Sequence, residues 1–91
     1  MFEPELIEKA QEFLALCKEQ NIKIVTAESC TGGLLAGLFT EIAGSSAVFD
    51  RGFITYSNQA KHDLLGVGQE LLDNYGAVSR QVAEAMAQGA L

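Results

Sequence analysis

The sequence predicts an α/β fold, and three observations carry that prediction. Residues 22–26 are short, apolar and β-branched, which is typical of a buried strand. Residues 47–56 repeat this character after a loop. Five other segments show helical spacing of apolar residues or helix start and stop signals. Because a two-stranded sheet is marginal on its own, we expect the chain to be the first half of a larger α/β domain, or to complete its sheet with a partner.

The composition limits the classes of function. The 91 residues allow one small domain or part of one. Six lysines and arginines against twelve acidic residues give a net charge of −6, which repels a phosphate backbone, so we expect no nucleic-acid partner. No apolar run is long enough to span a membrane, and the N-terminus lacks the basic start of a secretory signal, so we expect no membrane partner.

Potential metal ligands are few. The two cysteines, Cys17 and Cys30, fit no metal-binding spacing, and the one histidine is His62. We therefore expect no metal site. Cys17 falls on the apolar stripe of the first helix, where we expect it in the core, and both thiols are expected to be reduced, as in a cytosolic protein.

The first helix is expected to begin at Pro4, which suits the first turn of a helix. Its apolar residues form one stripe, namely Leu6, Ile7, Ala10, Phe13, Leu14 and Cys17. Asn21 is expected to end the helix in a left-handed conformation.

A polar turn follows the first strand and leads into the second helix. Its residues are Glu28, Ser29, Cys30, Thr31, Gly32 and Gly33. Glycines let a bound group approach the backbone, and the first N–H groups of a helix attract negative charge. The turn therefore predicts an anion pocket or an oxyanion site. The alternative is local, with Ser29 or Thr31 capping the helix and the glycines easing a tight bend. Glu28 could orient Lys61 or a ligand hydroxyl, although capping is the simpler explanation for it.

The second helix is expected to stop at Gly44, and to pack closely on the sheet through Gly33 and Gly37. Ser45 and Ser46 then open a loop, either as a simple turn or as phosphate contacts.

In the second strand, Gly52 is expected to mark a bulge or a close backbone approach. Phe53, Ile54 and Tyr56 are expected to be buried.

The remaining helices have predicted caps. They are expected at 58–65 between Ser57 and Gly66, at 69–75 before Gly76, and after Ser79, where Val82, Met86 and Ala90 share a face.

Lys61 is a candidate general base in the helix over 58–65. A neutral lysine amine can take a proton from a serine hydroxyl. The alternative is a solvated surface lysine. Tyr56, just before this helix, can stack on an aromatic ring, hold the lysine by its hydroxyl, or lie in the core. His62 is expected to face water, and Arg51 and Arg80 are candidates for a substrate phosphate or simple surface charges.

Four ordered motifs resemble one family. They are Thr26-Ala-Glu-Ser-Cys-Thr-Gly-Gly33, Ile42-Ala-Gly-Ser-Ser46, Arg51-Gly-Phe-Ile-Thr-Tyr-Ser-Asn58 with Lys61, and Gly76-Ala-Val-Ser79 followed by Met86-Ala-Gln-Gly89. From about residue 5 to residue 91 the chain resembles the C-terminal domain of competence/damage-inducible protein CinA, including stand-alone bacterial nicotinamide-nucleotide amidohydrolases. Family members continue for nearly as long again beyond the position of Leu91, with further strands.

The resemblance implies a three-layer α/β/α fold and a hydrolase of the pyridine-nucleotide salvage route in the cytoplasm. The implied reaction converts the carboxamide of nicotinamide mononucleotide to nicotinate mononucleotide and ammonia, without metal or cofactor. The implied partner is thus a small nucleotide substrate, and we expect a homo-oligomer. The alternatives are a nucleotide-binding module without catalysis and an inactive fragment that needs the rest of the domain.

By position, the resemblance implies Ser29 as nucleophile, Lys61 as base, and Tyr56 as an assisting or stacking residue. Backbone N–H groups around Thr31, Gly32 and Gly33 would stabilise the oxyanion or hold phosphate. The other implied substrate contacts are Glu28, Cys30, Ser45, Ser46 and Asn58. Chemistry alone leaves Ser29, Cys30, Thr31 and Ser46 open as the attacking group.

Overall fold

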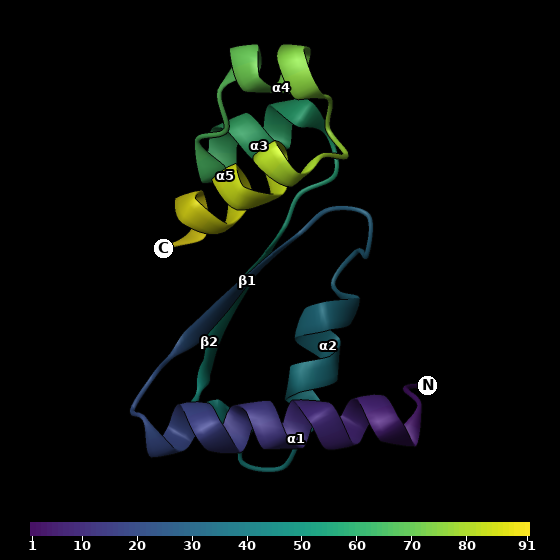
Figure 1. The fold of residues 1–91 in the computed structure, drawn as a ribbon, viewed down its shortest axis with the longest axis vertical. Coiled ribbons are helices and arrows are strands. Elements are labelled where there is room, and N and C mark those ends of the chain that lie inside the picture. The colour runs from purple at the N-terminus through teal and green to yellow at the C-terminus, as the bar shows by residue number, and fades with distance from the viewer.

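The computed structural model describes residues 1–91 as two parallel strands between two groups of helices (Figure 1). The strands are β1 (Ile24–Glu28) and β2 (Phe49–Ile54). On one face lie α1 (Pro4–Glu19) and α2 (Leu34–Thr40), and on the other α3 (Asn58–Leu65), α4 (Gln69–Tyr75) and α5 (Arg80–Ala90). A short 3-10 turn, η1 (Ser45–Ala47), leads into β2. The α/β prediction is confirmed.

Two apolar clusters hold the layers together. Under α1 and α2 the buried residues are Ala10, Leu14, Cys17, Leu38, Phe39, Ile42 and Val48. Under α3, α4 and α5 they are Leu65, Val67, Leu72, Val82 and Met86. Cys17 is therefore a core residue, as predicted.

A bulge lets β2 supply apolar side chains to both clusters. Ile24 pairs with Phe49, but Val25 pairs with Arg51, so Asp50 is an extra residue. In a regular strand, residues four positions apart lie on the same face. The bulge changes this, so Phe49 packs with the α1–α2 cluster whereas Phe53 packs with the other cluster. The predicted bulge at Gly52 is wrong by two residues.

Gly52 is instead a point of close approach, the other alternative that its position indicated. A Cβ there would lie 2.5 Å from the hydroxyl oxygen of Thr26 on β1. Gly33 is similar, since a Cβ there would lie 2.8 Å from Ile54 Cδ1. The same prediction is wrong for Gly37, where the nearest such atom is Phe2 Cζ at 3.9 Å.

The element boundaries follow local hydrogen bonding. α1 begins at Pro4 and the chain turns at Asn21, whose φ is 56°, both as predicted. The first strand starts two residues later than predicted, because the Ile22 N–H donates to Cys17 O and extends the end of α1. Ser57 caps α3 by accepting from Ala60 N at 3.0 Å, and Ser79 caps α5 by accepting from Val82 N at 3.2 Å.

Some apolar residues are exposed. Ile54 and Tyr56 at the end of β2 are exposed, against prediction, and so are Leu34 and Leu35 at the start of α2. Ile54 lies at the end of β2 next to Gly33, and Leu34 and Leu35 begin α2, so these exposed residues are found where the strand and the helix meet the polar turn.

We expect Gly89→Ala to destabilise the chain by about 1–3 kcal/mol, although alanine favours a helix. A Cβ at Gly89 would overlap the carbonyl oxygen of Leu65 and lie 2.7 Å from its carbon, so α5 would have to move off α3. Urea unfolding measures the change. Gly68→Ala is the control, since nothing lies within 4 Å of a Cβ there. Gly68 is the N-cap of α4, so the loss of a favoured cap and the lower unfolded-state entropy of alanine oppose each other, and the net cost should stay within about 0.5 kcal/mol. Equal costs for the two variants would contradict this account of the α3–α5 packing.

Candidate active site

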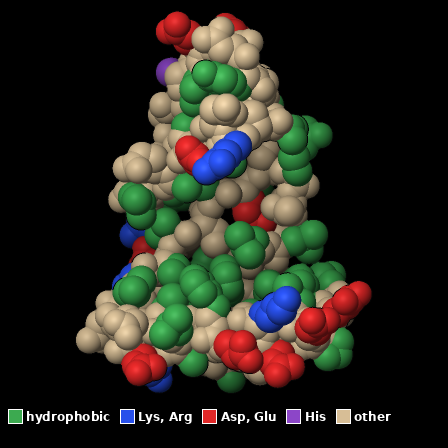
Figure 2. Space-filling model, viewed as in Figure 1, with side chains coloured by type: hydrophobic (Ala, Val, Ile, Leu, Met, Phe, Trp, Pro, Cys, Tyr) green, Lys and Arg blue, Asp and Glu red, His purple; other side chains and the backbone are tan.

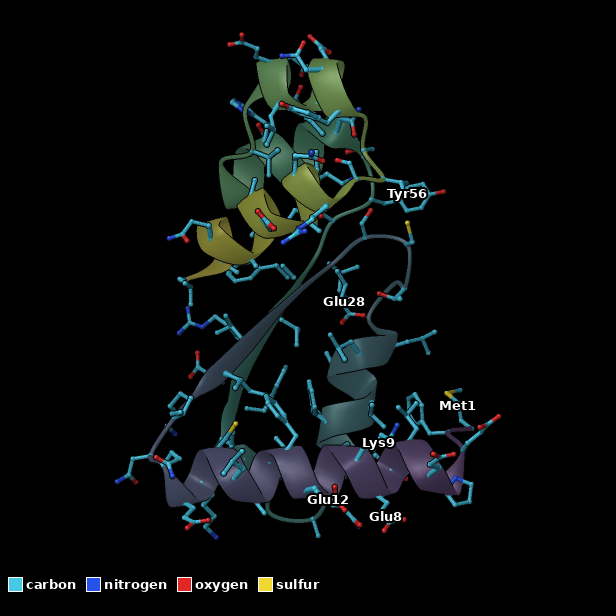
Figure 3. The ribbon with its side chains drawn as sticks, viewed as in Figure 1. Met1, Glu8, Lys9, Glu12, Glu28 and Tyr56 are labelled. Carbon is cyan, nitrogen blue, oxygen red and sulfur yellow. The ribbon has the colours of Figure 1, made fainter.

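Glu28 fastens the polar turn to α2. It is the last residue of β1 and is only 3% exposed. One carboxylate oxygen accepts hydrogen bonds from Thr31 Oγ1 at 2.7 Å and Leu35 N at 2.8 Å, and the other accepts from Ala36 N at 2.9 Å. Figure 3 shows Glu28 pointing from β1 toward the start of α2. Glu28 therefore caps α2, rather than Ser29 or Thr31.

The capping bonds also set the charge of Glu28. Burial raises the pKa of its carboxyl, but hydrogen bonds from Ala36, Thr31, Leu35 and Gly33 outweigh burial and hold the pKa below the usual 4.5. The group is an anion at neutral pH. Because this anion occupies the first turn of α2, the prediction that the helix end itself binds a substrate anion is wrong.

The turn leaves two side chains that Glu28 does not hold. Ser29 is half-buried and Cys30 is exposed, whereas the hydroxyl of Thr31 is bound to Glu28. The Gly32 N–H was predicted to be free to bind an oxyanion, but it donates to Ser29 O at 3.2 Å. Gly32 and Gly33 have φ of 60° and 101°, which an L side chain rarely adopts.

Lys61 is buried, so the solvated alternative is wrong. The residue is 1% exposed, and its Nζ donates to the carbonyl oxygen of Tyr56 at 2.8 Å. No carboxylate pairs with it, since the two ion pairs of the chain are Asp50–Arg51 and Glu84–Arg80. Tyr56 thus holds the lysine by its carbonyl and not by its hydroxyl. The phenol ring is 82% exposed and points away from the molecule (Figure 3).

The parallel sheet brings these residues to one edge. The Thr55 N–H donates to Glu28 O at 2.8 Å, and the Thr55 hydroxyl donates to the same oxygen at 3.3 Å. Ser29 follows Glu28 and Tyr56 follows Thr55, so both lie at the carboxyl ends of neighbouring strands. The Lys61 amine is attached to the same edge through Tyr56 O.

A cavity of about 370 Å³ opens at this edge. Ser29, Cys30 and Thr31 line one side, and Ala77, Val78, Ser79, Ala83 and Met86 line the other. The loop before α5 is held in place because Ser79 Oγ donates to Gly76 O at 2.9 Å. This apolar wall was not predicted from the sequence, although the motif Gly76-Ala-Val-Ser79 contains three of its residues.

Other candidates lie elsewhere. Ser45 and Ser46 precede β2, so a six-residue strand, roughly 20 Å long, separates them from the turn. Ser45 lines a different cavity against α1, so the structure does not bring the serine pair to the turn. Asn58 is exposed at the start of α3.

The remaining charged candidates are on the surface. Arg51 and Arg80 pair with Asp50 and Glu84, and His62 is exposed. No three histidine, cysteine or acidic side chains are grouped so that they could hold a metal ion. None of the helices has the length and apolar character that crossing a membrane requires.

The fold and the site define a class, an α/β domain with a hydroxyl- and thiol-bearing turn after one strand and a buried lysine held just after the neighbouring strand. The family model described as the CinA C-terminal domain matches residues 7–91. The chain therefore belongs to the CinA C-terminal domain family, as its motifs indicated.

Named relatives agree with this membership. The chain is 56% identical over its full length to a nicotinamide-nucleotide amidohydrolase PncC of Enterobacter agglomerans, of which it covers 56%. It is 48% identical over its full length to the PncC of Escherichia coli K12, of which it covers 55%. The chain thus spans a little over half the length of these relatives.

Solved structures of CinA proteins also match nearly the whole of this chain with about half of their own length. The crystal structure of competence/damage inducible protein CihA from Agrobacterium tumefaciens is 56% identical, with a TM-score of 0.95 over all of this chain and 55% of that one. A CinA superfamily protein from Escherichia coli is 33% identical, with a TM-score of 0.91 over 99% of this chain and 54% of that one.

We expect the free energy of unfolding of the chain to fall on acidification, because Glu28 becomes protonated. Its folded-state pKa is lowered, so its contribution is present above pH 4.5 and is lost as the pH falls through the lower folded value. Glu28→Gln should cost about 1–3 kcal/mol at pH 7, since one amide group would face the N–H donors, and should flatten this acid limb. Urea unfolding from pH 3 to pH 7 measures both effects. Glu41→Gln, at an exposed site, is the control. An unchanged acid limb in Glu28→Gln would refute the capping role.

Proposed function

We propose that this chain carries the catalytic turn of an amidohydrolase that converts nicotinamide mononucleotide to nicotinate mononucleotide and ammonia. The observation that carries the proposal is the burial of Lys61, with its amine at the sheet edge from which Ser29 emerges. Its relatives' names supply the substrate, because two of them are nicotinamide-nucleotide amidohydrolases. The enzyme would serve pyridine-nucleotide salvage in the cytoplasm, as a homo-oligomer.

In the proposed reaction, Ser29 Oγ attacks the carboxamide carbon while the Lys61 amine accepts the hydroxyl proton. The proton then passes to the leaving nitrogen, ammonia departs, and an ester to Ser29 remains. Water attacks this ester, Lys61 takes a proton from the water, and nicotinate mononucleotide leaves as the proton returns to Ser29. Apart from one water molecule, no group outside the chain and the substrate is needed for the balance.

The chain offers partners for each charge in this reaction. The backbone N–H groups of Cys30 and Thr31 donate to no other group of the chain, so we assign the oxyanion to them. Glu28 acts as a positioning residue, since its two oxygens are taken by Thr31 and α2. The exposed ring of Tyr56 offers a stacking face for the pyridine, with Asn58 beside it.

The test measures ammonia release from nicotinamide mononucleotide. The assay uses the chain alone and the chain continued after Leu91 by the part of the Agrobacterium tumefaciens relative that lies beyond the matched region. In the continued protein, Ser29→Ala and Lys61→Arg should each lower the rate about 10³-fold or more, because arginine stays protonated and cannot act as a base. Lys61→Met is a second variant without the charge, and circular dichroism checks folding.

The matched controls are Cys30→Ala and Ser46→Ala, which should keep the rate within about threefold because neither side chain takes part in the proposed steps and alanine keeps the backbone N–H. If Cys30→Ala loses activity while Ser29→Ala keeps it, the nucleophile is the thiol and the serine mechanism is wrong. Saturable binding of the nucleotide in calorimetry without ammonia release would make the protein a binding module.

A further inference from the structure

Thr55 is the one buried side chain between residues 54 and 59, where β2 ends and the chain passes to α3. It is 1% exposed, whereas Ile54 before it and Tyr56 after it are exposed to solvent. Residues 57–59 are exposed as well, so most of the segment that joins β2 to α3 lies at the surface. Such a segment opens easily unless hydrogen bonds or buried contacts hold it.

Two hydrogen bonds attach Thr55 to the end of β1. Its N–H donates to Glu28 O at 2.8 Å, and its hydroxyl donates to the same oxygen at 3.3 Å. A carbonyl oxygen has two lone pairs, so Thr55 supplies a donor for each of them. Because a β-branched side chain is stiff about its first torsion and this one is buried, the hydroxyl is held at Glu28 O rather than turned toward water.

The bonded carbonyl lies on a path between the two reacting groups of the proposed mechanism. Glu28 O belongs to the peptide unit that leads into Ser29, and Tyr56 O, in the residue after Thr55, accepts from Lys61 Nζ at 2.8 Å. The path from Ser29 to the amine therefore runs through Glu28 O, Thr55 and Tyr56 O. Glu28 is itself held on its other side, because its carboxylate is bound by the polar turn and by α2.

The cap of α3 holds the segment after the Tyr56 carbonyl. Ser57 Oγ accepts from Ala60 N at 3.0 Å, and Ser57 O accepts from Lys61 N at 3.1 Å. The Tyr56 carbonyl thus lies between two anchored residues, Thr55 and Ser57. Since neither ion pair of the chain includes Lys61, this carbonyl determines where the amine lies.

We propose that Thr55 is a positioning residue, whose hydroxyl keeps the Tyr56 carbonyl, and with it the Lys61 amine, at the place from which the amine reaches Ser29. Proton transfer requires the two atoms to approach within about 3 Å, and a displacement of about 1 Å costs on the order of a hundredfold in rate. The effect on rate rests on the proposed function, whereas the placement of the amine does not.

The first measurement is of kcat and KM for ammonia release by the continued protein. Thr55→Val keeps the size of the side chain and the backbone N–H but removes the hydroxyl, so kcat should fall about tenfold or more while KM stays within about twofold. Thr55→Ser retains a hydroxyl and should keep kcat within about threefold of the unchanged protein.

Thr40→Val is the matched control for the loss of a threonine hydroxyl. The Thr40 hydroxyl also donates to a backbone carbonyl, Gly37 O at 3.1 Å, but Thr40 is the last residue of α2, at the end away from the polar turn. Neither kcat nor KM should change in this variant.

The second measurement follows the lysine without substrate. A short pulse of reductive methylation with formaldehyde and cyanoborohydride labels accessible amines, and mass spectrometry of peptides gives the label at each lysine. Lys9 and Lys18 are the internal references, because they are exposed on α1, along which Figure 2 shows charged side chains at the bottom of the view. Relative to them, Lys61 should be labelled about fivefold faster or more in Thr55→Val, since its amine leaves the Tyr56 carbonyl more often.

Urea unfolding of each variant separates positioning from stability. Labelling is compared at urea concentrations that give the proteins equal free energies of unfolding, so global opening cannot produce the difference. Thr55→Cys is the second variant if Thr55→Val does not fold, because a thiol is a weak donor of similar size, and its kcat should fall about fivefold or more.

The proposal is wrong if Thr55→Val keeps kcat within about threefold, or if Thr55→Ser loses as much activity as Thr55→Val. An unchanged label at Lys61 in Thr55→Val would also overturn it, whatever happens to the rate. If the continued protein releases no ammonia, the amidohydrolase proposal fails, and the labelling of Lys61 alone then decides whether Thr55 places the amine.

Discussion

The buried carboxylate of Glu28 is the interaction on which the rest of this structure depends. A buried charge is costly unless hydrogen bonds satisfy it, and Glu28 is satisfied by Thr31, Leu35 and Ala36 together. Those bonds join the end of β1, the glycine turn and the start of α2 into one unit. The orientation of Ser29 and Cys30 therefore follows from a strand residue rather than from the helix that comes after the turn. An anion that belongs to the protein occupies the place where a phosphate would otherwise bind.

The second constraint is the extra residue at Asp50. Without the bulge that it makes, Phe49 and Phe53, which are four residues apart, would lie on the same face of β2, and one of the two helical layers would lose its aromatic contact with that strand. With it, a sheet of two strands has apolar surface on both faces and supports a helical layer on each. The candidate site depends on this arrangement, since the turn comes from one layer and the wall of its cavity from the other.

Local chemistry was predictable from the sequence, and long-range placement was not. The caps at Ser57 and Ser79 were predicted because a cap depends on a few adjacent residues. The burial of Lys61 was left open, because a lysine in the first turn of a helix looks the same whether or not other elements cover it. Ile54 and Tyr56 were expected to be buried from their apolar character, but both are largely exposed to solvent at the end of β2. Ser45 and Ser46 were grouped with the turn because the sequence does not say at which end of the sheet a loop lies.

The close approach of Gly52 to Thr26 has a consequence for how this sequence can vary. Any residue larger than glycine at position 52 would press on the Thr26 hydroxyl and spread the two strands apart. Its neighbours Asp50 and Arg51 are exposed and paired with each other, so their side chains take no part in this contact between the strands. Within three consecutive positions, β2 therefore combines a site closed to larger side chains with two whose side chains face solvent.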